Sequence, residues 1–214
     1  MCKLSESKKI TAIQIQDKRK NRRSIFLDHE FAFGIDVEIL VKHQLVVGDE
    51  LLPAKINDII IDEQRKQAKN KAFQLLRVRA RSEKEIRDRL RQSKFTQDII
   101  IWTVDELKRL NFINDSDFAK VYSRSRMVTH PQGSFLLKRE LMNFGILESD
   151  IEIGISEAYK ESSELEIAEH LVIKRKRLLN IEEQKAKKKI CDFLLRRGFS
   201  WDIVNEILAN WEKY

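Results

Sequence analysis

The sequence predicts a mainly α-helical protein: tandem three-helix repeats preceded by a small N-terminal β-meander. A leucine followed five residues later by a large apolar residue recurs with spacings of 51 and 53 residues, as Leu90/Phe95, Leu141/Ile146 and Leu194/Phe199. Alanines open the three units with spacings of 47 and 49 residues, at Ala72, Ala119 and Ala168. Only 6 Gly and 2 Pro occur in 214 residues, too few for a chain of many β-turns. Stacked helical repeats usually present a surface for binding rather than enclose a pocket.

Residues 1–62 form the first predicted domain, a β-rich extension with a short helix. Alternating apolar residues predict strands at 10–16, 23–27 and 31–35, joined by polar turns at 17–21 and 28–30. Asp36 is expected to cap a short helix over 37–43, and 48–51 is a predicted turn. A two- or three-stranded sheet is marginal alone, so we expect it to pack on the first helical repeat.

Residues 63–115 form the first predicted helical repeat, and residues 56–61 are expected to continue into the long helix that opens it. Ala68, Ala72, Leu75 and Leu76 fall on one stripe of that helix, which indicates its buried face. Ser82 with Glu85 three residues later is a capping box that starts a second helix. Thr96 is expected to cap the third helix.

Residues 116–160 and 161–214 form the second and third predicted repeats. Repeat two is expected to begin at Ser116 or Asp117. Gly145 and Gly198 are predicted helix stops, where glycine readily takes the left-handed conformation. In repeat three, Asn180 with Glu183 predicts a second capping box, and Ser200 is the predicted cap of the last helix.

Basic residues concentrate in two repeats. The chain holds 41 Lys and Arg against 34 Asp and Glu, a net charge of +7. Residues 65–91 hold eleven basic and three acidic side chains and residues 174–197 hold ten and three, whereas residues 138–170 hold three and nine. Either these clusters are solvated helix faces, or they form an electrostatic surface for nucleic acid or an acidic partner.

Fifteen basic residues are therefore the candidate partner- or DNA-binding side chains: Arg77, Arg79, Arg81, Arg87, Arg91, Lys174, Arg175, Lys176, Arg177, Lys185, Lys187, Lys188, Lys189, Arg196 and Arg197. Few aromatic residues lie near them, which disfavours sequence-specific reading of bases and favours contacts to a phosphate backbone or a protein surface. Trp201 follows a predicted cap and is a further possible contact, whereas Trp102 is expected in the core.

No catalytic, cofactor-binding or metal-binding residues are predicted. The four histidines show no paired spacing typical of a metal site, and no Walker loop, GxGxxG or GxSxG motif occurs. Asp115 and Asp117 flank a helix start, where carboxylates suit the helix dipole better than a nuclease metal pair. Cys2 and Cys191 are expected to be free thiols, Cys191 as a small core residue. With no secretory signal or membrane span predicted, we expect a cytoplasmic monomer.

Three ordered motifs resemble the RecX family. They are Arg79-x2-Ser82-Glu83-x2-Ile86-x3-Leu90, then Leu107-x3-Asn111-Phe112-Ile113-Asn114-Asp115-x2-Phe118-Ala119-x2-Tyr122-x3-Arg126, then Gly133-x3-Leu137-x2-Glu140-Leu141-x3-Gly145-Ile146. The run Phe193-Leu194-x2-Arg197-Gly198-Phe199-Ser200-x2-Ile203 is similar to that family's last repeat, and the β-rich start to an extension some members carry. Each motif is weak alone, but their order and spacing are specific and span nearly the whole chain. The segment between Tyr159 and Asn180 fits the family pattern only loosely.

The resemblance implies that the tandem three-helix repeats form an elongated, curved array. It also implies a bacterial, non-enzymatic regulator of RecA recombinase, acting in DNA repair, recombination and the SOS response. It would contact the RecA–DNA filament and reduce strand exchange, ATP hydrolysis and coprotease activity. The family has no catalytic motif to carry over. Two alternatives stay open: a nucleic-acid-binding helical module that acts without RecA, and a hydrolase of nucleic acid.

Overall fold

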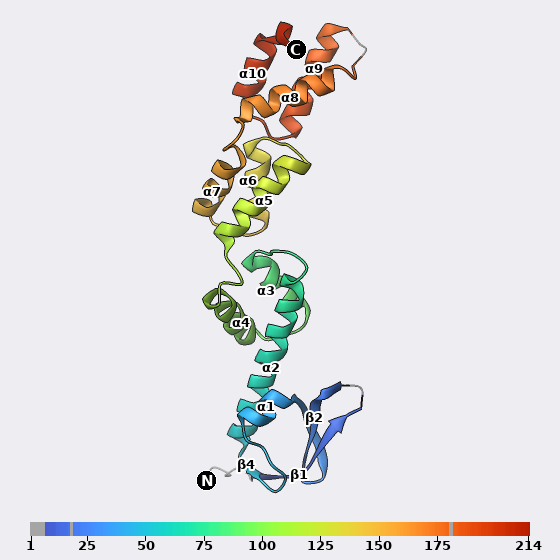
Figure 1. Ribbon diagram of the computed structural model, residues 1–214, viewed down its shortest axis with the longest axis vertical. Helices are drawn as coiled ribbons and strands as arrows, with labels where there is room; N and C mark the ends of the chain where they lie inside the picture. Colours follow the sequence, from blue (N-terminus) through green and yellow to red (C-terminus); the bar gives the residue numbers. More distant parts are fainter. Residues whose placement is uncertain (1–6, 18, 180–181) are drawn as a thin grey trace, which may run out of the picture. The chain divides into compact units, whose positions relative to one another are not determined.

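The computed structural model describes residues 7–17, 19–179 and 182–214, and these form two compact units (Figure 1). One unit contains the chain up to Val78 together with Arg87–Arg109, and the other contains Arg79–Ile86 and Leu110–Tyr214. In the described residues, strands occur only near the N-terminus and helices make up most of the rest. The predicted mainly α class with an N-terminal meander is therefore confirmed.

The N-terminal sheet is antiparallel, with strand order β3-β2-β1-β4. Its strands are β1 (Lys8–Gln16), β2 (Arg19–Leu27), β3 (Glu30–Asp36) and β4 (Glu50–Leu51). The predicted turn at 28–30 is a tight hairpin, in which Asp28 and His29 both have positive φ, at 49° and 71°. Two successive left-handed residues match the twist of the strands that they join.

Two predictions for this sheet were wrong. The second strand begins at Arg19 and not at 23, because the polar residues of 19–22 continue the pairing in a solvent-exposed part of the hairpin. The predicted turn at 48–51 ends in β4, where Leu51 pairs with Lys8. A strand of two residues has no periodicity from which the sequence could reveal it.

The core of the sheet is closed by α1 (Val37–Lys42) and by the N-terminal half of α2 (Pro53–Leu76). Asp36 caps α1 as predicted, since its side chain accepts a hydrogen bond from the backbone N–H of Glu38. Ile59 of α2 is fully buried among apolar residues of the sheet and of α1. The expectation that the sheet packs on the long helix is confirmed, and α2 passes without a break through residue 62.

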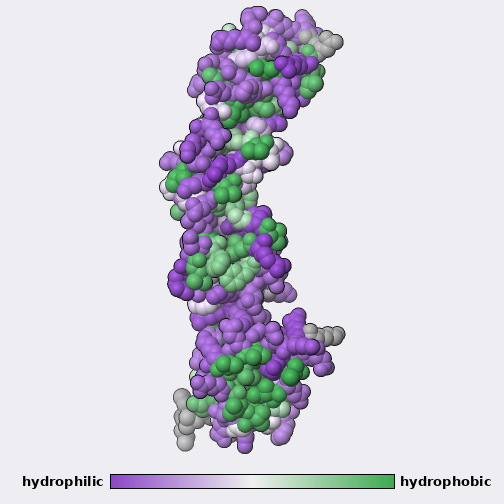
Figure 2. All heavy atoms as spheres, viewed as in Figure 1, coloured by the Kyte–Doolittle hydropathy of each residue, from purple (hydrophilic) through white to green (hydrophobic). Residues whose placement is uncertain are grey.

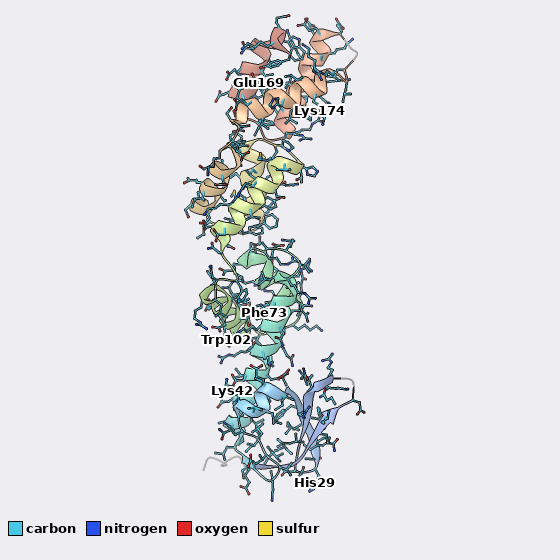
Figure 3. The ribbon with its side chains drawn as sticks, in the orientation of Figure 1. His29, Lys42, Phe73, Trp102, Glu169 and Lys174 are labelled. Carbon is cyan, nitrogen blue, oxygen red and sulfur yellow. The ribbon has the colours of Figure 1, made fainter. Side chains whose placement is uncertain are left out.

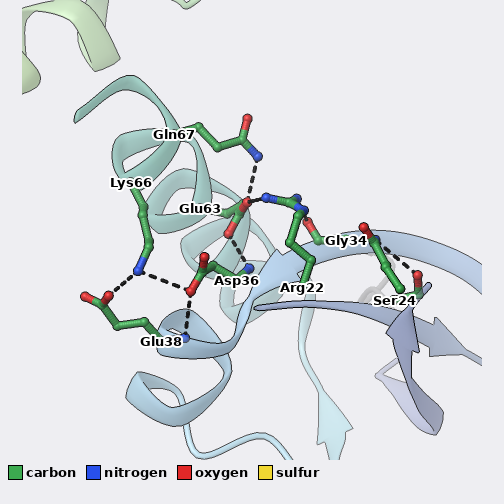
Figure 4. Close-up of polar contacts among 9 residues, drawn as sticks. Arg22, Ser24, Gly34, Asp36, Glu38, Glu63, Lys66 and Gln67 are labelled. Carbon is green, nitrogen blue, oxygen red and sulfur yellow. Dashed lines mark hydrogen bonds and ion pairs between the residues drawn. The ribbon is translucent and has the colours of Figure 1, made fainter. Parts of the chain in front are cut away.

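Glu63 of α2 is 5% exposed and joins the helix to the sheet through its carboxylate (Figure 4). Arg22 of β2 donates to one oxygen at 2.6 Å, and the backbone N–H of Asp36 donates to the other at 2.8 Å. Gln67, one turn along α2, also donates to Glu63 at 2.6 Å. A buried carboxylate is tolerated only when it is paired and hydrogen-bonded in this way, so these contacts fix how α2 meets the sheet.

The remaining helices follow the predicted order. They are α3 (Glu83–Gln92), α4 (Gln97–Arg109), α5 (Asp115–Thr129), α6 (Ser134–Asn143), α7 (Glu148–Ala158), α8 (Glu164–Lys176), α9 (Glu183–Arg196), α10 (Trp201–Ala209) and the short 3-10 helix η1 (Trp211–Lys213). The capping box at Ser82 and Glu85 is confirmed by hydrogen bonds in both directions at 3.3 Å. Ser200 caps α10 by accepting from the N–H of Ile203.

Three helix positions differ from prediction. Repeat two begins at Asp115, one residue before the predicted range, because the side chain of Asn114 is the cap. Glu182 occupies the N-cap position of α9 without a side-chain capping bond, and the helix starts at Glu183, so the predicted capping box is not the start of this helix; Asn180 lies outside the described residues. Trp102, expected in the core, is only partly buried, and the guanidinium of Arg65 lies over its ring at 4.8 Å.

The repeated leucines occupy equivalent environments. All three leucines and the three repeated alanines are 0% exposed: Leu90, Leu141, Leu194, Ala72, Ala119 and Ala168. Each leucine carbonyl accepts the N–H of the apolar residue five positions later, in the pairs Leu90/Phe95, Leu141/Ile146 and Leu194/Phe199, at 3.3, 3.2 and 3.1 Å. Lys94, Gly145 and Gly198 precede these residues with φ of 65°, 77° and 80°. The spacing seen in the sequence is therefore the signature of a Schellman helix end.

The start of each second helix lies against the end of the second helix of the next repeat; we call this contact the repeat junction. At the first junction the Ser82 hydroxyl donates to the carbonyl of Phe144 at 2.8 Å. At the second, the Gly133 N–H donates to the carbonyl of Arg197 at 2.8 Å. The positive end of one helix dipole thus meets the negative end of another, and each supplies partners for groups the other leaves unpaired.

A carboxylate completes each junction from an equivalent position. Asp115, the first residue of α5, accepts the N–H of Glu83 at 2.8 Å. Glu164, the first residue of α8, accepts the N–H of Ser134 at 2.8 Å. The function predicted for Asp115, as a carboxylate at a helix start, is thus extended: it also stabilises the start of a helix in the preceding repeat.

Replacing Glu63 by Ala should lower the free energy of unfolding of the N-terminal unit by about 3–5 kcal/mol, because Arg22 would remain largely buried without its partner. Glu38 is the matched control: its side chain is 76% exposed in the ion pair with Lys66, so Glu38→Ala should cost less than about 1 kcal/mol. Denaturant unfolding combined with hydrogen exchange of α2 measures both. Equal losses would contradict the anchoring function of Glu63.

Replacing Gly133 by Ala should destabilise the unit that contains residues 110–214 by about 1–3 kcal/mol or more. A Cβ at this position would lie 2.2 Å from the carbonyl oxygen of Gly198, while the φ of −79° suits alanine, so the effect isolates the contact. Ser134→Ala is the control at the adjacent position, and thermal unfolding is the measurement. A Gly133→Ala protein as stable as that control would show that the junction can open without cost.

Candidate partner-binding surface

The arginines of the first predicted cluster are largely engaged with the protein itself. Arg79 forms a two-pronged ion pair with Glu85, and Arg81 approaches the same carboxylate at 3.4 Å. The hydrogen bonds that Arg79 donates to Glu85 raise the pKa of Arg79. Arg91 pairs with Asp88 at 2.7 Å. Much of the charge of this cluster therefore supports the capping box that starts α3.

The same cluster is divided between the two compact units. Arg77, Arg87 and Arg91 belong to the N-terminal unit, whereas Arg79 and Arg81 belong to the other. Arg77 is exposed at the C-cap of α2. The five arginines therefore do not all belong to one compact unit, and their binding function stays a prediction.

The second predicted cluster lies wholly within one unit, on α8 and α9. Lys176 lies 4.3 Å from the Trp211 ring and donates to that residue's carbonyl, while Lys187 lies 5.6 Å from the same ring. Lys185 pairs with Glu182. The exposed remainder forms no ion pair with any residue in the described part of the chain: Lys174, Arg175, Arg177, Lys188, Lys189 and Arg196.

A groove of about 560 Å³ adjoins this cluster, between the end of α5 and the helices α8 and α9; we call it the basic groove. Its lining is Met127, Val128, Thr129, His130, Pro131, Ile167, His170, Leu171, Lys174, Arg175, Leu178, Phe193 and Arg197. Figure 3 shows Lys174 on α8 beside this region. Three of the predicted basic residues therefore meet at one concave surface.

The second repeat junction adjoins the basic groove, since Arg197 and Pro131 both line it. Arg197 follows α9 and donates through Nη1 to the carbonyl of Pro131 at 2.6 Å, while its own carbonyl accepts from Gly133. Its guanidinium carbon lies 5.1 Å from the centre of the Phe193 ring, and that of Arg175 lies 5.5 Å from the same centre. Two guanidinium groups are thus held by cation–π contacts in the groove.

The lining combines positive charge with exposed apolar surface. It includes Lys174, Arg175 and Arg197 and contains no Asp or Glu. Val128 and Leu178 are 85% and 73% exposed. A concave surface with cations beside bare aliphatic side chains is typical of a binding site for a partner that carries both kinds of group.

Sequence reasoning missed most of this groove, since only Lys174, Arg175 and Arg197 of its lining were predicted. The histidines were given no binding function, and His130 and His170 both line the groove, from different elements. No spacing in the sequence connects 127–131 with α8 and α9, because the repeat junction alone brings them together. Trp201 is 59% exposed as expected, but it does not line the groove, and its contact function stays a prediction.

A second hollow lies on the N-terminal unit and is mainly apolar. It measures about 510 Å³ and is lined by Lys8, Leu27, Ala32, Phe33, Pro53, Ile56, Asn57 and Ile60. Figure 2 shows hydrophobic side chains gathered on the visible face of this unit. It contains none of the predicted site residues, so the basic groove is the better candidate.

Thiol and metal-ligating groups form no recognisable site in the described residues. Cys191 packs against the apolar core of repeat three, and burial raises the pKa of its thiol, followed by the charge of Asp192; Cys2 lies outside the described residues. No cluster of three or more His, Cys, Asp or Glu residues that could hold a metal ion is found in the described ranges. Nor is any described helix both long and apolar enough to cross a membrane.

Glu140 is the centre of a polar network beside the groove. Arg126 donates to both of its oxygens, and Tyr122 and Gln132 donate to Oε2 at 3.0 and 2.8 Å. Burial would raise the pKa of Glu140, but the hydrogen bonds from Arg126, Gln132 and Tyr122 outweigh it and hold the pKa below its ordinary value. The network connects α5, the 130–133 segment and α6, and so supports the chain that carries Met127 to Pro131.

Comparison with known proteins identifies the family. The family model described as Regulatory protein RecX N-terminal domain matches residues 8–51, which hold the sheet and α1. Models of the first and third three-helix domains of RecX match residues 68–107 and 162–208. A Regulatory protein RecX from Clostridium acetobutylicum is 31% identical over 208 residues, covering 95% of this chain and 96% of its own length. The chain belongs to the RecX family.

Other RecX proteins agree with this assignment. A Regulatory protein RecX from Listeria monocytogenes serotype 4b is 34% identical over 196 residues, covering 91% of this chain and 72% of its own length. A crystal structure of regulatory protein RecX has a TM-score of 0.75 at 27% identity, covering 94% of this chain and 99% of that one. RecX from Lactobacillus salivarius has a TM-score of 0.64, covering 72% and 99%. The predicted resemblance is confirmed, and the relatives are named as regulators.

The stabilising effect of Glu140 should depend on pH. A carboxyl whose pKa is lowered by folding contributes stability above its unfolded pKa, near 4.3, and loses it as the pH falls through the folded value. We therefore expect wild type to exceed Glu140→Gln in unfolding free energy at pH 6, with the difference shrinking below about pH 4. Denaturant unfolding at several pH values measures this. A difference that does not change with pH would mean that the ionised form is not what stabilises the network.

Proposed function

We propose that this protein regulates RecA recombinase by binding RecA or the RecA–DNA filament, and that it reduces strand exchange, ATP hydrolysis and SOS coprotease activity without catalysing a reaction itself. Family membership across nearly the whole chain carries the proposal, since the relatives are named regulatory proteins. A regulator of RecA would act in the cytoplasm, in DNA repair and recombination.

The surface chemistry supports a binding mechanism. Most exposed cations of α8 and α9 form no ion pair with a described residue, Lys185 being an exception, and three basic residues meet at the basic groove. Binding that favours one state of an assembling filament shifts the balance between assembly and disassembly through affinity alone. Tandem repeats increase the overall affinity further, because one chain can contact several neighbouring filament subunits at once.

The direct test is RecA-dependent ATP hydrolysis on single-stranded DNA with the purified full chain added. We expect inhibition at or below one chain per RecA. Unchanged hydrolysis, together with no co-sedimentation on RecA-coated DNA, would overturn the proposal.

DNA binding without RecA is the second candidate, and the exposed basic residues of α8 and α9 favour it. A protein that contacts several phosphates loses affinity for free DNA by orders of magnitude between low and moderate salt. A salt titration on free DNA separates the two functions. Tight, steeply salt-dependent binding to free DNA with no added affinity for the filament would favour this second candidate.

Replacing Lys188 and Lys189 by Glu should raise the concentration needed for half inhibition roughly 5–30-fold, since each exposed charge contributes about 0.5–1 kcal/mol to an interface. Both side chains are exposed on α9. Arg139 and Lys160, exposed in the same unit, provide the control pair Arg139→Glu and Lys160→Glu, which should leave inhibition within twofold. Equal effects of the two pairs would show that net charge and not the α9 face matters.

A further inference from the structure

The basic groove presents cations whose charge nothing in its lining neutralises. Lys174 and Arg175 are exposed, and neither forms an ion pair with a residue in the described ranges. Arg197 uses one of its N–H groups to donate a hydrogen bond to the carbonyl of Pro131. A guanidinium has five donors, so the others can receive a carboxylate in the two-pronged geometry that arginine favours.

Fixing Arg197 in advance favours binding. Its side chain is held by the Pro131 carbonyl and by the Phe193 ring, 5.1 Å away. A group that is ordered before the ligand arrives loses less conformational entropy on binding. The groove thus offers at least one preformed site for an anion.

The apolar part of the groove limits what the anion can be. Among the described residues of this unit, Val128 and Leu178 are the most exposed large hydrophobic side chains, at 85% and 73%, and both line the groove together with Met127 and Leu171. A phosphate backbone would leave these aliphatic side chains uncovered. Covering them requires an apolar side chain within a few ångströms of the anionic group.

The groove also lacks an open stacking platform for bases. Proteins that bind single-stranded nucleic acids combine a positively charged groove with aromatic rings on which successive bases stack. Phe193 is the one Phe, Tyr or Trp among the lining residues, and the guanidinium groups of Arg175 and Arg197 already lie over its ring. Charge and shape therefore favour a peptide, and a volume of about 560 Å³ is of the size that holds a few side chains.

We propose that the basic groove binds a short acidic peptide segment of a partner protein, with carboxylates on Lys174, Arg175 and Arg197 and an adjacent aliphatic or aromatic side chain against Val128 and Leu178. This rests on the proposed function only in that the partner is expected among the proteins that the chain regulates. The groove itself can be tested without any such partner.

The experiment is fluorescence anisotropy of the full chain with three labelled probes: a ten-residue Asp/Glu peptide with two Leu and one Phe, the same peptide with Ala at those three positions, and a single-stranded oligonucleotide of equal charge. We expect the first peptide to bind at least tenfold more tightly than the other two. Equal binding of the two peptides, or tighter binding of the oligonucleotide, would overturn the proposal, the latter in favour of a nucleic-acid site.

Variants locate the binding. Lys174→Gln with Arg175→Gln should weaken the first peptide at least tenfold, whereas Arg139→Gln with Lys160→Gln removes the same charge elsewhere on the unit and should change it less than twofold. Val128→Ser should weaken it at least threefold. Val121→Ser, which alters a 54% exposed valine of the same helix, should not. Loss of affinity in the control pairs as well would overturn the assignment to the groove.

Peptide binding and RecA inhibition, both measured on wild type, separate this inference from the proposed function. If wild type binds the peptide but does not inhibit RecA, the regulatory function fails and the groove stands. If wild type inhibits RecA but binds no acidic peptide, the groove assignment fails and the regulatory function stands. Unchanged thermal unfolding of each variant shows that a loss of binding is not a loss of fold.

Discussion

The repeat junction is the contact on which the described arrangement of residues 110–214 depends. Helix starts carry unpaired N–H groups and helix ends carry unpaired carbonyls, and the junction joins one to the other across neighbouring repeats. The Gly133 N–H meets the Arg197 carbonyl, and Glu164 accepts the next N–H along the chain. Polar groups that would otherwise need water or separate caps are thus satisfied between repeats, in an arrangement that recurs at Ser82, Phe144 and Asp115.

Close approach of backbones at the junction explains the glycines. Gly198 has φ of 80°, which ends α9, and a Cβ there would lie 2.4 Å from the backbone nitrogen of Leu136. A larger residue at position 198 would therefore strain the backbone, and it would also push the two helices apart. Lys94 has the equivalent left-handed conformation at the end of α3, where no such close neighbour demands glycine. The basic groove is a consequence of this geometry, since the junction that seats Gly133 on Arg197 also brings Pro131 beside α9.

Buried carboxylates direct the polar contacts in both units. Glu63 ties α2 to the sheet, and Glu140 ties the end of α5 to α6, each by accepting several hydrogen bonds including one or more from an arginine. Such groups are costly to bury, so they favour the one arrangement that satisfies all of their acceptors. Many basic residues that appear free in the sequence, such as Arg79 and Arg126, are consequently internal partners of these and similar acids.

The sequence by itself determined the helical class, the repeat and the helix ends, because these are local. A leucine, a left-handed residue and an apolar residue at fixed spacing specify a Schellman end within six positions, as at Leu141, Gly145 and Ile146. The sequence also predicted Ser82 and Ser200 as helix caps, and it showed the surplus of positive charge on α8 and α9. Tertiary structure alone decided which charges are paired internally and which line a groove. Arg81 approaches Glu85, whereas Arg175 and Arg197 line one groove together with Phe193, His130 and Val128. Contacts between residues some 65 positions apart depend on how one repeat seats on the next, and no local pattern encodes that distance.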